Sequence, residues 1–468
     1  MCCCDWCWSS RSVPDGDDNG RGTASVTNVP QEVNPYAGAS TSQDPDPSTT
    51  SGNGERRKLT VTLICLSSLT SFTSVLPVFG PRIREFFSLS NEQFGSLMGM
   101  QSVGRIAALL FVGLLISRYG VRRIAELGIA GCGAGFLLLG IGGGITLFQS
   151  GMTFLGLFIG LGSVAHPAFL FALYPEFKRR IFSVRLVSFA APGILLPLLA
   201  GSVLSWPGSD SDNVFHWVLY GPCLLVGCAM LGGGLFMALQ EYPFEKSADE
   251  RQTGMGQLQA RSRIRPLELL NARSLLIIVL ISLHAAADNT VYIFLPMFME
   301  HHFLHLPVAP AYAVAGHGLA YLVTRGLLSV TPERFAQRAI LCLSGPVGGS
   351  IVIAAIWSGN PAYVPVLYAL SCFIFAAEFP TLVSELSARS LGNMGIILSA
   401  AYLVAELAKF GMLMMTGRVA DQTGDYRVAL TFAAVGFVAF GVIAFFAGFG
   451  RRGDENSMNR SEARKDSL

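Results

Sequence analysis

The sequence predicts an all-α polytopic membrane protein with twelve transmembrane helices in two pseudo-symmetric six-helix bundles. Of the 468 residues, 51% are hydrophobic and only 14% are charged, whereas roughly 25% of the residues in an ordinary soluble domain are charged. From Leu59 onward, apolar runs alternate with short polar breaks. Each run is long enough to cross a hydrocarbon core of ~30 Å as a helix. Loops at corresponding positions of the two halves also share a motif, which indicates an internal repeat.

The apolar runs define twelve expected spans. They are Leu59–Phe79, Phe94–Leu115, Ile124–Ile145, Leu147–Leu173, Phe182–Leu204, Val214–Leu239, Ser274–Met297, Ala309–Val330, Ala339–Trp357, Ala362–Leu386, Gly392–Met415 and Val428–Phe449. The only long internal loop separates the sixth span from the seventh, so the spans divide six plus six.

This division predicts five regions. They are a disordered N-terminal tail (1–55), an N-terminal six-helix bundle (56–240), a central loop (241–273), a C-terminal six-helix bundle (274–450) and a C-terminal tail (451–468). With both termini in the cytoplasm, the inward loops hold fifteen Lys and Arg residues and the outward loops hold four. The positive-inside rule therefore predicts cytoplasmic termini, in a plasma or inner membrane.

The repeated motif follows spans two and eight. The first copy is Gly113-Leu-Leu-Ile-Ser117-Arg118-Tyr-Gly120-Val-Arg122-Arg123, and the second is Ser329-Val-Thr-Pro-Glu333-Arg334-Phe-Ala336-Gln-Arg338. The first copy resembles the signature Gly-x-x-x-Asp-Arg-x-Gly-x-Arg-Arg of the major facilitator superfamily, with Ser117 in place of the aspartate. A segment after span eleven, Gly417-Arg-Val-Ala-Asp421, is also similar to that family.

The resemblance implies a secondary transporter that works by alternating access. It also implies that the motif residues of both copies form cytoplasmic gating loops, in which the family's aspartate helps to latch that side. Glu126 or Glu385 could take the place of this missing aspartate. The expected gating residues are Gly113, Arg118, Gly120, Arg122, Arg123, Glu333, Arg334 and Arg338.

Ionisable residues inside spans are functional candidates, because burying Arg, Lys or Asp at mid-helix costs at least ~2.5 to 3.5 kcal/mol on insertion scales. His317, Tyr321 and Arg325 stand at i, i+4 and i+8 on span eight, and His284, Asp288 and Tyr292 do so on span seven, so each set shares one helix face. The two faces should meet at a common cavity. The expected substrate-binding residues are Arg105, Arg325, Lys409, Tyr321, His317 and Gln101, and the expected proton-coupling residues are Asp288, His284, Glu378 and Glu406.

The two arginines favour an anionic substrate, because a guanidinium is a planar, permanently charged donor that suits carboxylate, nitrate or phosphate. The position of Arg325 is similar to that of an arginine in monocarboxylate and nitrate carriers of the superfamily, and Lys409 is similar to a lysine of oxalate-type carriers. Proton coupling needs a carboxylate or histidine whose proton affinity differs between the two access states, and Asp288 with His284 is the first candidate pair.

Structural roles compete with these functional ones. Glu406 and Lys409, at i and i+3, are candidates for mutual neutralisation, and His166, beside Pro167, is a candidate for packing at a kink. Glu385 and Arg389 are candidates for a solvated or gating pair. Aromatic and Met residues of the seventh span, Phe294, Met297 and Phe298, would suit an exporter of drugs or other amphipathic compounds, which is the main alternative function.

A transporter-like sensor is a further alternative. No hydrolase, metalloprotease or phosphate-loop motif is present in the sequence, so an enzyme is not expected. We expect a monomer in a lipid bilayer that binds a small-molecule substrate and a coupling proton, without cofactor, metal or nucleic acid. The N-terminal cluster Cys2-Cys3-Cys4-Asp-Trp-Cys7 is compatible with lipidation, metal binding or a wrongly assigned translation start, and we favour the last.

Overall fold

The computed structural model describes residues 48–174, 178–206, 211–240, 272–303, 309–331, 337–389 and 394–448. The chain divides into two compact units, Met1–Thr49 and Thr50–Leu468, and the contacts described below lie within the second. Residues 241–271 of the predicted central loop (241–273) and the whole predicted C-terminal tail (451–468) lie outside the described residues.

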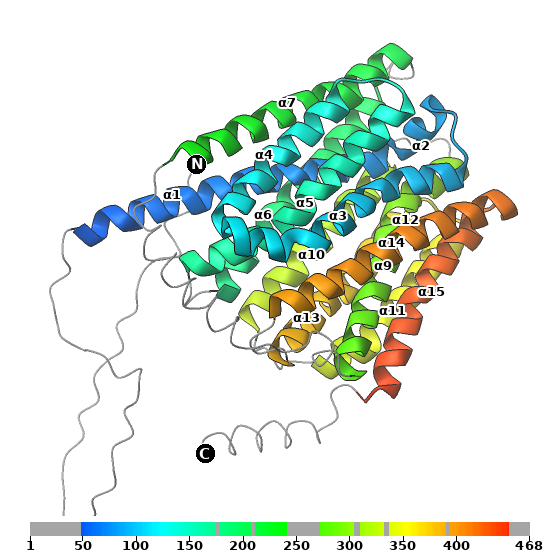
Figure 1. Cartoon of the computed structure of the whole chain (residues 1–468). Helices are drawn as coiled ribbons and strands as arrows, with labels where there is room; N and C mark the ends of the chain where they lie inside the picture. The colour runs from blue at the N-terminus through cyan, green and yellow to red at the C-terminus, as the bar shows by residue number, and fades with distance from the viewer. Residues whose placement is uncertain are drawn as a thin grey trace, which may run out of the picture. The chain divides into compact units, whose positions relative to one another are not determined.

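The described residues form helices joined by short turns (Figure 1). The first half contains α1 (Ser48–Ser68), η2 (Leu69–Val75), α2 (Leu76–Phe86), α3 (Asn91–Tyr119), α4 (Val121–Gly140), α5 (Ile145–Leu173), α6 (Lys178–Leu204) and α7 (Asp212–Leu239). The second half contains α9 (Ala272–His302), α10 (Ala309–Val330), α11 (Gln337–Trp357), α12 (Tyr363–Phe375), α13 (Glu378–Arg389), α14 (Met394–Thr423) and α15 (Tyr426–Phe446).

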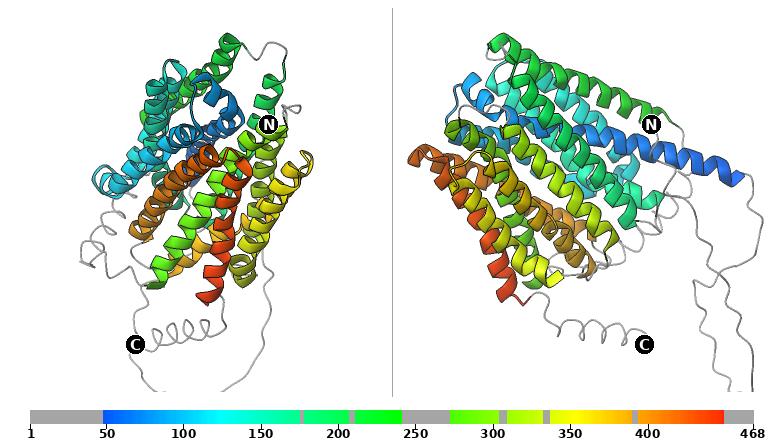
Figure 2. Two further views of the ribbon diagram at one scale, coloured as in Figure 1. Left: turned by 90° about the vertical axis from the view of Figure 1, so that its right-hand side faces the viewer. Right: turned by 180° about the vertical axis from the view of Figure 1, so that it is seen from behind.

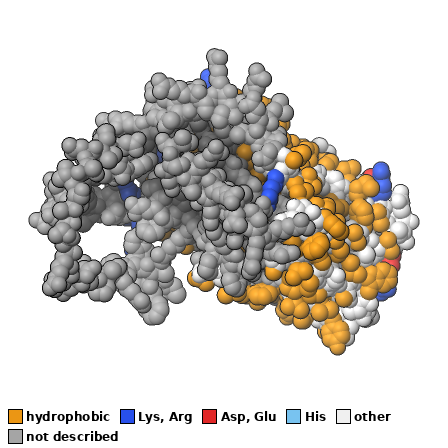
Figure 3. All heavy atoms as spheres, turned by 90° about the horizontal axis from the view of Figure 1, so that it is seen from below, with side chains coloured by type: hydrophobic (Ala, Val, Ile, Leu, Met, Phe, Trp, Pro, Cys, Tyr) orange, Lys and Arg blue, Asp and Glu red, His pale blue; other side chains and the backbone are white. Residues whose placement is uncertain are grey.

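The twelve predicted spans correspond to these helices. Eleven of them are long and apolar enough to cross a membrane. The remaining span, α10, has 22 residues, which is ample length for a crossing, but it carries His317 and Arg325. Large apolar side chains are exposed along the helices, for example Leu114, Leu199 and Leu225, and Figure 3 shows such side chains over much of the visible described surface. The predicted fold class is therefore confirmed.

Two spans are not continuous α-helices. The first consists of α1, η2 and α2, and the 3₁₀ segment η2 coincides with a run of hydroxyl residues. Thr70 and Thr73 donate to the carbonyls three residues before them, at 2.7 and 3.0 Å. Such side-chain bonds compete with the regular α-helical ladder, which explains the local tightening. The helix also begins at Ser48, inside the segment predicted to be disordered, because the helical backbone continues beyond the apolar part through Arg56, Arg57 and Lys58.

The tenth span is interrupted between α12 and α13, at Ala376 and Ala377. Both alanines are buried, and the next residue, Glu378, begins α13. The interruption therefore places a carboxylate at the start of a helix in the interior of the protein.

The helices pack as two six-helix bundles, one from each half of the chain (Figures 1 and 2). In the first bundle α4 packs against α5 and α7, and α3 packs against α5. In the second, α11 packs against α12 and α15, and α9 against α14 and α15. The principal contacts between the bundles join α3 with α14, and α6 with α10.

Glycines bring α3 against α5 with backbone in contact. A Cβ atom on Gly104 would lie 1.9 Å from the carbonyl oxygen of Thr153, and one on Gly156 would lie 2.0 Å from that of Gln101. No larger residue fits at these distances without moving a helix. Small residues at such positions allow the close helix approach on which membrane packing depends.

Candidate functional site

The first polar group of the interior joins α3 to α14. Glu406 of α14 accepts hydrogen bonds from Ser102 Oγ at 2.7 Å and from an Arg105 guanidinium nitrogen at 3.2 Å, both on α3. Lys409, one turn further along α14, also donates to Glu406. Gln101 Oε1 accepts a bond from Arg105 at 3.2 Å. The predicted neutralisation of Glu406 by Lys409 is therefore present, but Arg105 shares the same carboxylate.

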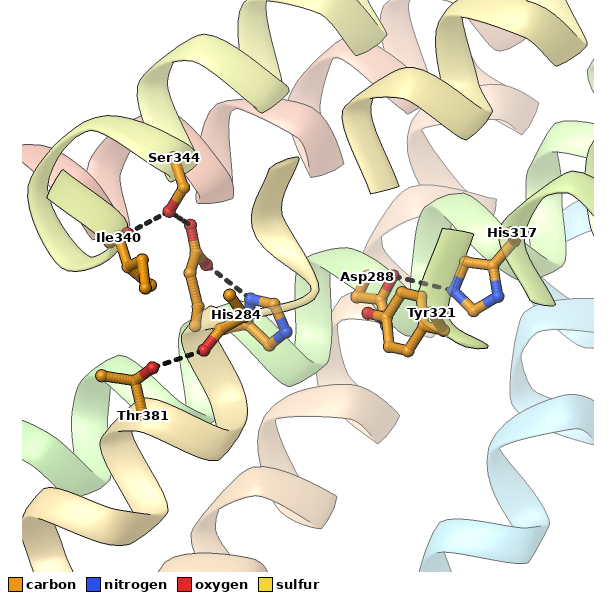
Figure 4. Close-up of polar contacts among 9 residues, drawn as sticks. His284, Asp288, His317, Tyr321, Ile340, Ser344 and Thr381 are labelled. Atoms are coloured by element: carbon orange, nitrogen blue, oxygen red, sulfur yellow. Dashed lines mark hydrogen bonds and ion pairs between the residues drawn. The ribbon is translucent and has the colours of Figure 1, made fainter. Parts of the chain in front are cut away.

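The second group joins α9 to α10, as the facing polar stripes predict. Asp288 of α9 accepts a hydrogen bond from Tyr321 Oη at 2.7 Å and lies 3.3 Å from His317 Nε2 (Figure 4). The Arg325 guanidinium stacks over the Tyr321 ring, 4.5 Å from its centroid. Arg325 forms no ion pair with a carboxylate in the described part of the chain. Tyr292, on the same face of α9, points toward the first span and donates to the Ser74 carbonyl at 3.4 Å.

The third group lies deeper, around Glu378 at the start of α13. Its carboxylate is 2.6 Å from Nδ1 of His284 and accepts a bond from Ser344 Oγ at 2.5 Å (Figure 4). The Glu378 side chain is fully buried and that of His284 is 3% exposed. His284 is surrounded by the rings of Phe375, Phe379, Phe437 and Phe440. His284 and Asp288, the first candidate pair for proton coupling, thus find their hydrogen-bond partners on different neighbouring helices.

Sequence reasoning missed one interior cation, Arg185 of α6. The residue is only 9% exposed, and its Nε atom has no hydrogen-bond partner among the residues that the structure describes. Its guanidinium stacks on the Phe189 ring at 4.9 Å. Arg185 falls near the start of the predicted span Phe182–Leu204, where an arginine side chain often reaches the polar boundary of the membrane. The sequence feature that could have identified Arg185 as an interior cation is its position inside that apolar run.

One end of the structure is closed by contacts between the bundles. Asp421, in the last turn of α14, accepts hydrogen bonds from the backbone N–H groups of Asn91 and Glu92, at 2.9 and 2.8 Å. These are the first two residues of α3. An ion pair of 3.0 Å between Arg418 and Glu92 lies beside them. We call this set of contacts the Asp421 latch.

Three further residues, Arg84, Tyr426 and Gly417, make contacts at the Asp421 latch end. Arg84 donates to Asn91 Oδ1 at 2.8 Å and to Tyr426 Oη at 3.0 Å, and Tyr426 donates to Asn91. A Cβ atom on Gly417 would lie 2.3 Å from the Asn91 carbonyl oxygen, so α14 meets α3 here without an intervening side chain. The segment that begins at Gly417 therefore connects the two bundles at this end.

The opposite end carries the first copy of the repeated motif. Gly120 separates α3 from α4 with φ of +84°, a conformation that favours glycine. Arg122 pairs with Glu126 at 2.7 Å and donates to the Gln240 carbonyl at 2.8 Å, while Arg118 lies over the ring of Tyr119. Arg123 is exposed. Glu126 is thus an acidic partner for a motif arginine, whereas Glu385 lies on α13.

In the second copy, Glu333 and Arg334 lie outside the described residues. Arg338 is the second residue of α11, and its side chain also lies outside the described part. Gly113 lies on α3, with open space around its α-carbon.

Two alternative assignments can be compared with the structure. His166 is buried and its Nε2 lies 3.1 Å from the Ala125 carbonyl, an arrangement that fits the packing role. Phe294, Met297 and Phe298 are 0%, 3% and 0% exposed. These three side chains, which would suit an exporter of amphipathic compounds, pack into the hydrophobic core.

The sequence matches a known protein family. A family model described as "Major Facilitator Superfamily" matches residues 61–405. The chain belongs to the major facilitator superfamily. It is a multi-pass integral membrane protein, and members of this family are transporters of small molecules rather than enzymes. No curated protein sequence matches the chain.

Solved structures of this superfamily have the same fold. A bacterial homologue of the human lysosomal transporter Spinster, in an inward-facing and occupied conformation, has a TM-score of 0.64 at 14% identity, over 85% of this chain and 98% of that one. The E. coli fucose:proton symporter FucP has a TM-score of 0.57 at 16% identity, over 83% and 98%. FucP in the outward conformation has a TM-score of 0.56 at 17% identity, over 83% and 97%.

Proposed function

We propose that this member of the superfamily is a proton-coupled carrier of a small anion that works by alternating access. The observation that carries the proposal is the excess of positive charge at the interface between α3 and α14. Arg105 and Lys409 share a single carboxylate, that of Glu406. Buried charge without a counter-charge is costly, so an anion that binds here gains more than a neutral or cationic solute does.

Arg325 supports an anionic substrate from the opposite bundle. Its guanidinium stacks on Tyr321 and forms no ion pair with a carboxylate in the described residues, which leaves its donors for a substrate. Tyr321 in turn donates to Asp288. An anion bound by Arg325 is therefore connected to Asp288 and His317 through one side chain.

Glu378 and His284 are the proton-binding pair in this proposal. They lie 2.6 Å apart and are almost completely buried, and no lysine or arginine forms an ion pair with Glu378 among the described residues. Adding or removing one proton therefore changes the net charge of the pair without displacing a permanent counter-ion. His284 lies one helical turn from Asp288 on α9, so the charge of the His284–Glu378 pair acts directly on the carboxylate of Asp288.

Alternating access requires that the two ends of the bundles open in turn, and we propose that the Asp421 latch is the outer gate in its closed state. The predicted orientation places this end outside the cell.

Flux into proteoliposomes tests the proposal. Purified protein is reconstituted and assayed with radiolabelled acetate, lactate, succinate, nitrate and phosphate, with and without an inward pH gradient. We expect uptake of at least one anion, stimulation by the gradient, and loss of uptake in Arg105→Ala and Arg325→Ala. Arg82→Ala is the matched control, because Arg82 pairs with Glu85 at the Asp421 latch end, away from the interior groups. Wild-type rates in both interior variants would refute the anion assignment, and binding without flux would favour the sensor.

A further inference from the structure

We infer that Glu406 of α14 is an internal competitor of the substrate. Its carboxylate occupies Arg105 of α3 while the carrier is empty, and a substrate anion displaces it from Arg105. The inference rests on the proposed anion carrier and deepens it, because it gives the interior carboxylate a role in setting the affinity for the substrate. It also connects substrate binding with the contact between the two bundles.

The Glu406 carboxylate takes the place that an anionic substrate would take. Its Oε1 accepts a hydrogen bond from Arg105 Nη1 at 3.2 Å and another from Lys409, and its Oε2 accepts one from Ser102 Oγ at 2.7 Å. Two cationic donors and a hydroxyl that converge on one carboxylate form a donor set suited to carboxylate, nitrate or phosphate. In this structure a group of the protein itself therefore fills the anion site.

The two cations hold Glu406 with different strength. Lys409 lies three residues after Glu406 on the same helix, so their contact does not depend on the position of the other bundle. Arg105 reaches Glu406 from α3 through one nitrogen and one oxygen at 3.2 Å, without the two parallel bonds of a bidentate pair. Its other terminal nitrogen donates to Gln101. Arg105 is therefore the partner that Glu406 gives up at the lower cost.

Donors for an incoming anion remain on the α3 side. Arg105 Nε and Gln101 Nε2 are buried atoms without a hydrogen-bond partner among the residues that the structure describes. Buried donors of this kind are costly unless a ligand or a water molecule binds them. The Arg105 side chain is also 25% exposed, whereas that of Glu406 is 9% exposed. The guanidinium is thus the more accessible member of the pair, and an anion that reaches it finds unused donors.

The charges balance when a monoanion enters. Arg105 and Lys409 carry two positive charges and Glu406 carries one negative charge, so one positive charge is in excess before binding. A monoanion on Arg105 removes this excess, while Lys409 stays paired with Glu406. Displacement therefore leaves no charge of the group without a counter-charge, which keeps the cost of the exchange low in the interior of a membrane protein.

Displacement also removes a tie between the bundles. In the described part of the chain, the hydrogen bonds between α3 and α14 lie at the Asp421 latch and at Glu406, which accepts from Ser102 and Arg105. When Glu406 releases Arg105, the interior bonds between the bundles are lost and those of the latch remain. Substrate binding thereby changes how the two bundles are held together.

A shorter carboxylate tests this inference. Glu406→Asp keeps the negative charge next to Lys409 but loses one methylene of reach toward α3, so it competes less well for Arg105. Anion affinity is measured on the full-length protein in detergent by thermal shift, relative to the unliganded unfolding temperature of each variant, with acetate, lactate, succinate, nitrate and phosphate. We expect Glu406→Asp to bind at least one of these anions about tenfold more tightly than the wild type, the effect of removing one charge-assisted contact from the empty state. A purely structural role of Glu406 predicts unchanged or weaker binding.

Ser102→Ala is the second variant, and it leaves every charge in place. The Ser102 hydroxyl holds Glu406 Oε2 at 2.7 Å, so its removal should also tighten anion binding. Glu85→Asp is the matched control for the shorter carboxylate, because Glu85 belongs to another i, i+3 ion pair, with Arg82. Ser150→Ala is the matched control for the hydroxyl, because Ser150 is exposed and bonds within its own helix, α5. Both controls should bind the anion with wild-type affinity.

The outcomes separate this inference from the proposed function. If the wild type binds an anion and neither Glu406→Asp nor Ser102→Ala binds it more tightly, the competitor role of Glu406 is refuted and the anion carrier stands. If Glu406→Asp does not fold, the affinity of Ser102→Ala decides alone. If no anion of the panel binds to the wild type or to either variant, the proposed anion carrier is itself refuted, and the inference is refuted with it.

Discussion

Replacing Asp421 by asparagine removes the charge that joins the end of α14 to the start of α3. The carboxylate accepts bonds of 2.8 and 2.9 Å from two N–H groups in the first turn of α3. Those N–H groups have no partner within their own helix, and they carry the positive end of the helix dipole. The change therefore weakens the contact between the bundles while leaving each bundle intact.

The size of the effect follows from these contacts. A hydrogen bond to a charged group contributes about 1.5–3 kcal/mol, and the attraction between a carboxylate and a helix N-terminus contributes about 0.3–1 kcal/mol. Asn retains one carbonyl oxygen that can keep one of the two bonds, and the exposed position of Asp421 reduces both terms. We expect a net loss of about 1–2 kcal/mol, which is about a fivefold to thirtyfold shift toward the open form.

Distances between spin labels measure this shift. In a background without other cysteines, labels at Ser88→Cys and Gln422→Cys report the separation of the two bundles, because both positions are exposed and they belong to different bundles. Asp421→Asn should add a population at longer distance. Arg418, Glu92 and Tyr426 keep their contacts, so the closed population should remain.

Asp425→Asn is the matched control. Asp425 caps α15 through the Arg427 N–H at 2.8 Å, and this contact lies within one bundle. The Asp425→Asn variant should have the same distance distribution as the wild type. An Asp421→Asn distribution identical to the wild type, or an equal shift in both variants, would refute the assignment of the latch.

Two further predictions concern the proton site and the packing of the first bundle. Glu378→Gln should abolish accumulation driven by a pH gradient but permit exchange of labelled for unlabelled anion across the proteoliposome membrane. Glu385→Gln, on the same helix, is the control. Gradient-driven accumulation at the wild-type level in Glu378→Gln would exclude Glu378 as the proton-binding residue. Gly104→Ala places a Cβ atom 1.9 Å from the Thr153 carbonyl oxygen, and overpacking of this kind costs about 1–3 kcal/mol, so the thermal unfolding temperature should fall. Gly113→Ala, on the same helix but in open space, should leave the thermal unfolding temperature unchanged or raise it. Equal effects of Gly104→Ala and Gly113→Ala would contradict the close packing of α3 against α5.

The sequence predicts the membrane architecture well because hydrophobic length is a local property. Each span is recognised from its own ~20 residues, without knowledge of its neighbours. The contact of Asp288 with His317 and Tyr321 could also be predicted from local spacing, because the spacing places the polar residues of α9 on one face and those of α10 on one face. What the periodicity leaves open is which neighbouring helix each face meets.

His284 illustrates that limit. It shares a face of α9 with Asp288, but its partner Glu378 comes from a helix 94 residues further along the chain, at a break that no motif announces. Arg185 illustrates a second limit, because its burial depends on how α6 packs against its neighbours. Pairing between distant helices and depth within the fold are tertiary properties, and a single sequence does not contain them as local signals.

The glycine contacts between α3 and α5 have a mechanical consequence for the arginine that they surround. A Cβ atom on Gly160 would lie 3.0 Å from the Cα atom of Arg105, and Gly104 and Gly156 make still closer backbone contacts nearby, at 1.9 and 2.0 Å. Arg105 is therefore attached to a stiff pair of helices instead of to a pliable one. A force exerted on its guanidinium displaces α3 and α5 together. In the proposed carrier, a ligand bound between Arg105 of α3 and Lys409 of α14 would contact both bundles at once, so its binding energy would act on their relative orientation.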